Sequence, residues 1–115
     1  MPAQFTDNTA TVTISDDASA TIDATELSAI GAKTSGTAAV TNAVVISGTP
    51  AQVTAALVSV ATLVVATTAT VTINDADSVY NTASNFNSIN EATTGLVTAT
   101  NVDTISGTND EFLVL

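Results

Sequence analysis

The strongest constraint in this sequence is an internal duplication. Residues Thr9–Ile14 recur as Thr68–Ile73, and the same shift along the chain, without a gap, places Ile46–Thr49 on Ile105–Thr108. We call this shift, which carries Thr9 onto Thr68, the repeat spacing. A chain rich in Thr and Ala matches these two residues by chance, but matches of Asp, Ile, Gly and Asn in one register are typical of units that bury a shared core. Further matched pairs are Asp16 and Asp75, Ile30 and Ile89, Gly36 and Gly95, and Asn42 and Asn101.

The composition excludes several classes of function. The 115 residues hold one Lys or Arg against eleven Asp or Glu, a net charge of -10 at pH 7, with no His and no Cys. Disulfides and thiol chemistry are therefore excluded. We expect no nucleic-acid partner, because a protein that binds phosphate groups needs basic patches to neutralise their charge. We also expect no membrane insertion, because the most apolar stretch, residues 55–66, is too short to cross a bilayer. Since 45% of the residues are hydrophobic and 10% charged, we expect a folded chain.

Each copy of the repeat alternates strands with short helices. Thr9–Ser15 has the two-residue periodicity of a strand, and Asp23–Glu26 has the form of a capping box that begins a helix. A second strand is predicted over Thr37–Ser47. A second capping box, Thr49–Gln52, has Pro50 at the first helical position, where its missing amide hydrogen costs nothing.

The end of that second helix is left open by the sequence. Apolar residues continue at helical spacing as far as Val64, but Leu63–Val65 could also open the strand that reaches Ile73. The second copy predicts the same order of elements. Its landmarks are Thr82 as helix cap, Phe86 and Ile89 as buried residues, a strand over residues 96–106, and a capping box at Thr108–Glu111.

This alternation predicts an α/β fold: a repeat-built solenoid of strand plus short helix units with a parallel sheet, because the helices act as crossovers between parallel strands. We expect a single repeat-built domain over residues 1–115, with repeat A at about 9–56 and repeat B at about 68–115. The alternative is an all-β immunoglobulin-like sandwich in which the capping boxes are turns.

The two copies resemble the tandem repeats of very large acidic secreted and surface proteins of marine and cyanobacterial type. The resemblance rests on the Thr-Val-Thr-Ile strand, an acidic turn, a short Leu-x-x-Ile helix, Thr-x-Gly and an Ile-Ser-Gly-Thr strand end, and it covers Thr9–Thr49 and Thr68–Thr108. It implies an adhesin-like protein, located outside the cell or at its surface, in which adjacent repeats of the array are the partners. Glycine-rich nonapeptide calcium repeats are absent from this sequence, so calcium binding is not carried over from the resemblance.

Acidic residues at equivalent turns are the candidate metal ligands. Asp16 and Asp17 follow the first strand, and Asp75 and Asp77 follow its copy, where their oxygens could hold calcium. A solvated turn explains the same residues, because neither turn has a glycine-centred loop. With no His, Cys or Arg beside the carboxylates and no nucleophile motif, we expect no enzyme and no cofactor other than calcium.

Two functions follow. The first is a structural spacer or scaffold, in which strong negative charge keeps neighbouring arrays apart. The second is a module that binds calcium, a glycan or ice through the acidic turns or through outward threonine rows. The apolar run Phe112–Leu115 predicts either a core element that awaits the next repeat or a surface for self-association. The threonine rows are Thr9, Thr11 and Thr13 in the first copy and Thr68, Thr70 and Thr72 in the second, predicted to stack in register.

Overall fold

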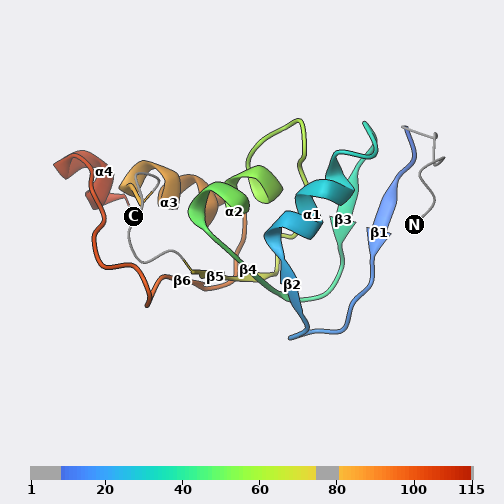
Figure 1. Ribbon diagram of the computed structural model, residues 1–115, viewed down its shortest axis with the longest axis horizontal. Coiled ribbons are helices and arrows are strands. Elements are labelled where there is room, and N and C mark those ends of the chain that lie inside the picture. The colour runs from blue at the N-terminus through green and yellow to red at the C-terminus, as the bar shows by residue number, and fades with distance from the viewer. Residues whose placement is uncertain (1–8, 75–80, 115) are drawn as a thin grey trace.

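The chain is an α/β protein with parallel sheets and four helices in its described part (Figure 1). The structure is a computed structural model that describes residues 9–74 and 81–114. The elements follow one another as β1 (Val12–Ile14), β2 (Thr21–Asp23), α1 (Ala24–Gly31), β3 (Ala38–Val40), β4 (Val45–Gly48), α2 (Pro50–Leu57), β5 (Thr70–Ile73), α3 (Ala83–Glu91), β6 (Val97–Thr98) and α4 (Asn109–Leu113).

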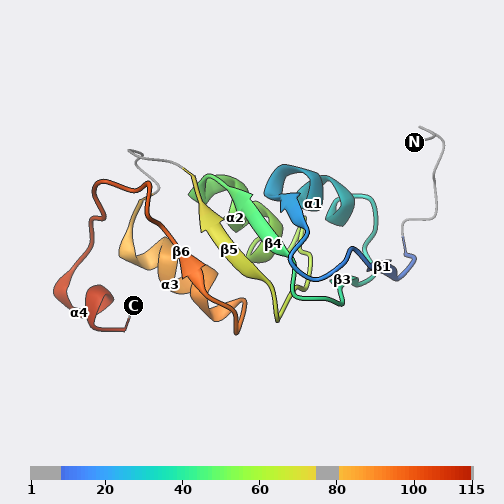
Figure 2. The same cartoon turned by 90° about the horizontal axis from the view of Figure 1, so that it is seen from below.

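Every strand pair in the described residues is parallel. β1 pairs with β3, and Val65 continues this small sheet through a bridge to Ala39. The larger sheet has the order β2-β4-β5-β6, and α1, α2 and α3 lie in a row over one of its faces (Figures 1 and 2). The predicted α/β class with a parallel sheet is therefore confirmed. The alternative of an immunoglobulin-like sandwich is wrong, because such a sandwich is built from antiparallel strands without helices.

The register of the larger sheet aligns an apolar row under the helices. Ile46 and Val71 lie side by side at its centre and are fully buried. Side chains alternate between the two faces of a strand, so the residues that follow this row face the other way. The apolar row is Ile22, Ile46, Val71 and Val97, and the row on the opposite face is Asp23, Ser47, Thr72 and Thr98.

Three of the four helices in the described residues begin with a threonine cap. At α2 the Thr49 hydroxyl accepts from the Gln52 amide (3.3 Å) and the Gln52 side chain accepts from the Thr49 amide (3.0 Å), as the capping box predicts. Thr108 and Glu111 form the same reciprocal pair at α4. The capping box predicted at α1 is wrong, because Asp23 precedes the helix without a side-chain cap bond.

The strand predicted over Thr37–Ser47 is divided in two by a corner. Asn42 accepts from the amide of Val44 through its carbonyl (2.9 Å), and its side-chain amide donates to the Asp16 carbonyl (2.8 Å). These bonds turn the chain from β3 in the small sheet to β4 in the large one. Local periodicity could not reveal the corner, because its partner lies 26 residues away.

Helix α2 ends at Leu57 because the chain folds back over its last turn. The final carbonyls of a helix lack intrahelical partners. Here the amide of Ser59 donates to the Thr54 carbonyl (2.9 Å), and the amide of Val64 donates to the Ala56 carbonyl (2.7 Å). The Thr62 hydroxyl donates to the carbonyl between them. Val64 therefore enters the core from an extended segment, and the helix does not reach it.

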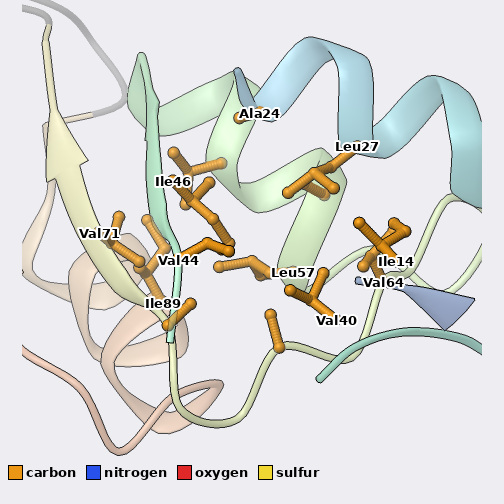
Figure 3. Packing of buried hydrophobic residues seen from close by; sticks show 14 of the residues in the cluster. Ile14, Ala24, Leu27, Val40, Val44, Ile46, Leu57, Val64, Val71 and Ile89 are labelled. Atoms are coloured by element: carbon orange, nitrogen blue, oxygen red, sulfur yellow. The ribbon is translucent and has the colours of Figure 1, made fainter. Parts of the chain in front are cut away.

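The core is built almost entirely of small and β-branched aliphatic side chains. Figure 3 shows Leu27 of α1 and Leu57 of α2 converging with Ile46 and Val71 of the sheet and with Val64. Phe86 and Ile89 of α3 are 4% and 0% exposed, as predicted. Within the described residues, no helix is both long and apolar enough to cross a membrane.

Candidate functional site

The acidic turn between β1 and β2 is the described part of the predicted calcium site. Asp16 and Asp17 are exposed. Their carbonyls hold the turn, since Asp16 accepts from Asn42 (2.8 Å) and Asp17 accepts from the Ala20 amide (3.0 Å). Ser19 adopts a positive φ of 71°, which closes the turn tightly.

The metal chemistry of this turn stays a prediction. Calcium in proteins takes six to eight oxygens, several of them from carboxylates. Among the described residues no group of three or more His, Cys, Asp or Glu side chains is placed to share an ion. Asp75 and Asp77, the equivalent pair of the second copy, lie outside the described residues.

The predicted stacking of the threonine rows is wrong. β1 and β5 belong to different sheets, so the threonines of one do not align with those of the other. Thr13 pairs with Ala39, whereas Thr72 lies between Ser47 and Thr98. The sequence predicted which residues face outward but not which strands would be neighbours.

A groove of about 550 Å³ lies beside the loop that follows α1. It is lined by small neutral residues between Gly31 and Ala38 on one side and by residues between Val60 and Val65 on the other. No acid, base or thiol is among these lining residues. The Thr34 hydroxyl is already engaged, since it donates to the Ala10 carbonyl and accepts from the Gly36 amide. The groove is therefore lined by aliphatic, hydroxyl and backbone groups without a charge.

A second hollow lies at the far end of the large sheet, beside β6 and α3. Its volume is about 230 Å³, and its lining is mainly apolar. Around it the chain exposes apolar surface that a small domain would normally bury. The lining residues are Phe86, Asn90, Val97, Ala99 and Ile105. The exposed apolar side chains at this end are Leu96 (72%), Phe112 (41%), Leu113 (74%) and Val114 (72%).

This open end was only partly predicted. The apolar run from Phe112 was recognised in the sequence, but the hollow at Ile105 was not. The signal that could have revealed it is the repeat itself: Ile46 and Ile105 are equivalent residues, one repeat spacing apart, and the strand that covers Ile46 belongs to the second copy of the repeat. In the structure Ile46 is 0% exposed, whereas Ile105 is only partly buried.

Comparison of the chain with protein-family models, with curated proteins and with solved structures finds no match. The described part of the chain combines these two uncharged hollows with the exposed acidic turn at Asp16 and Asp17 and with the open apolar end.

Proposed function

We propose that the chain is a structural repeat segment, a spacer or scaffold, of an extracellular bacterial surface or adhesin-like protein. In this proposal the chain is a solenoid of two equivalent units, and its work is mechanical: length, stiffness and solubility. The observation that carries the proposal is that the same internal contacts recur at the repeat spacing.

Two buried threonines make the clearest pair of such contacts. The Thr34 hydroxyl donates to the carbonyl of Ala10 and accepts from the next glycine amide at 3.0 Å. One repeat spacing later, the Thr93 hydroxyl donates to the carbonyl of Ala69 and accepts from the Gly95 amide, again at 3.0 Å. In both places a Cβ on the glycine would collide with that same carbonyl. A coincidence of sequence alone would not reproduce these bonds.

The helix starts give a second pair. A Cβ on Gly48 would lie 3.0 Å from the Ala24 Cβ, and a Cβ on Gly107 would lie 2.8 Å from the Ala83 Cβ. Each glycine therefore lets the preceding helix approach the strand end closely. The two reciprocal capping boxes described above, at α2 and α4, are also separated by one repeat spacing.

Shape and charge are consistent with a spacer. The chain measures 46 × 25 × 22 Å, and consecutive helices pack side by side along it. Units that contact only their neighbours extend in one dimension, and stability is then a sum over neighbouring contacts. A charge of -10 with Lys33 as the single cation disfavours close approach of parallel arrays. The location outside the cell rests on the resemblance of the repeats.

The proposal is tested by joining two copies through a three-residue linker, which places equivalent residues of the two copies two repeat spacings apart. We expect small-angle X-ray scattering to show a rod whose longest dimension is about double that of one copy. The matched control joins the copies through a long Gly-Ser linker, which behaves as a flexible chain. If both fusions scatter as two independently moving bodies, the chain is not a stiff spacer.

A further inference from the structure

The junction between the two halves of the chain shows how one unit receives the next. β4, near the end of the first half, pairs in parallel with β5, the first strand of the second half. The amide of Thr70 donates to the Val44 carbonyl (2.9 Å), and the amide of Asn74 donates to the Gly48 carbonyl (2.9 Å). The register is Val45 with Thr70, Ile46 with Val71, Ser47 with Thr72 and Gly48 with Ile73.

The equivalents of these two strands lack such a partner in the described part of the chain. At the repeat spacing, β4 corresponds to residues 104–107 and β5 corresponds to residues 11–14. Among the described residues β1 pairs with β3 alone, which leaves its other edge without a strand. Ser106 is bridged to Thr82 on one side, as Ser47 is paired with Asp23, and no described strand lies on its other side. Unpaired strand edges are templates for adding a strand.

Burial at equivalent positions shows what the open end lacks. Ile46 is 0% exposed, but Ile105 is partly exposed and lines the 230 Å³ hollow. Val53 in α2 is 0% exposed, but Phe112, its equivalent in α4, is 41% exposed. α2 packs against α3, whereas no described helix follows α4. The end of the second half therefore exposes the same surface that the first half buries at its junction.

The hollow in the second half lies where the first half has an additional segment, which contains Val64 and Val65. The amides of Val40 and Val65 donate to the carbonyls of Val65 and Ala38, each at 2.8 Å, so this segment runs beside β3. Val64 beside it is 1% exposed and enters the core. β6, the equivalent of β3, has no such neighbour in the described chain.

We propose that a second copy of this chain docks head to tail on this end. Its β1 pairs in parallel with residues 104–107 of the first copy, Val12 beside Ile105 and Thr13 beside Ser106. Its α1 then packs on α4 as α3 packs on α2. The inference rests on the proposed function, since it treats the two halves as equivalent units. Because the two surfaces differ, the contact is heterologous: each docked pair still presents one surface of each kind, so further copies can add and form a filament.

Cysteine cross-linking tests the register, since the natural chain has no Cys. Paired residues on neighbouring strands have the Cα separation that a disulfide needs. Thr13→Cys and Ser106→Cys are prepared as two separate proteins and oxidised as a mixture. Both positions are exposed, so neither variant should disturb folding.

The positive control is the Ser47→Cys, Thr72→Cys double variant, whose two positions are paired within one chain. The negative control is Ala29→Cys on the exposed face of α1 mixed with Ser106→Cys.

The expected result is a disulfide-linked dimer of the Thr13→Cys and Ser106→Cys chains, formed about tenfold faster than the dimer of the negative control. A rate equal to that control, while the internal pair closes, overturns the inference. Dimers formed mainly between two Thr13→Cys chains also overturn it, because that contact is symmetric. Either outcome leaves the spacer proposal to the tandem scattering experiment, in which the copies are joined covalently and need not find one another.

Discussion

At the scale of single residues, two threonine hydroxyls connect neighbouring parts of the chain. Thr34 is 9% exposed and Thr93 is 7% exposed, and each bonds a backbone carbonyl that lies 24 residues earlier in the sequence. Each also accepts from a glycine amide two residues on. A buried polar group left without its partner costs more than the bond itself contributes. These hydroxyls are therefore structural, even though threonine is common throughout the chain.

Replacing Thr93 by valine tests this role. The variant keeps the shape of the side chain but removes the donor to the Ala69 carbonyl and the acceptor for the Gly95 amide. We expect the free energy of unfolding, measured in urea, to fall by about 1–3 kcal/mol. Thr93→Ser should retain most of the stability, and Thr25→Val on the exposed face of α1 should change it by less than about 0.5 kcal/mol. If Thr93→Val and Thr25→Val lower the free energy of unfolding equally, the buried Thr93 hydroxyl does not stabilise the fold.

At the scale of helices and strands, equivalent positions do not always do the same work. Asp23 and Thr82 are separated by one repeat spacing, and each immediately precedes a helix. The Thr82 hydroxyl accepts from the Asn85 amide at 3.2 Å, whereas Asp23 makes no cap bond. The register places Asp23 at the edge of the large sheet, in the outer row with Ser47. The two helix starts thus share a fold but not a cap.

This difference predicts unequal effects of removing the two side chains. Thr82→Ala should lower the free energy of unfolding by about 1 kcal/mol, the usual contribution of a helix cap. Asp23→Ala should change it by less than about 0.5 kcal/mol, because no cap bond is lost. Thermal unfolding followed by circular dichroism measures both. A loss at Asp23 as large as that at Thr82 would mean that its charge stabilises the start of α1 without a hydrogen bond.

The elements that could be predicted are those specified by neighbours in sequence. Capping boxes and strand periodicity both act over a few adjacent residues, so the starts of α2 and α4 and the strand β5 were predicted correctly. The corner at Asn42 and the end of α2 at Leu57 depend on partners farther along the chain. The order of the strands was beyond prediction for the same reason. It decides that the threonines of β1 and β5 lie in separate sheets.

At the scale of the whole molecule, the second half extends the large sheet of the first half and not its small sheet. β5 corresponds to β1 at the repeat spacing, yet it joins the sheet of β2 and β4. The residues between Val58 and Ala69 link α2 to β5. Within this segment Val64 enters the core and Val65 pairs with β3. After the second half, Ile105 lines a hollow that no described strand covers. The candidate interface therefore follows from the repeat together with the strand order, and periodicity alone could not locate it.

Ile46 and Ile105 provide a measurement of how far the two halves are equivalent. Ile46→Val removes one buried methyl group and should lower the free energy of unfolding by about 1 kcal/mol. In a single chain Ile105→Val should cost clearly less, because Ile105 is only partly buried. In the tandem fusion with the three-residue linker, the same change in the first copy should cost as much as Ile46→Val, since β1 of the second copy then covers it. If the cost at Ile105 is the same in the single chain and in the tandem, the following copy does not pair with residues 104–107. The stiffness of the array would then have to come from contacts other than those seen between β4 and β5.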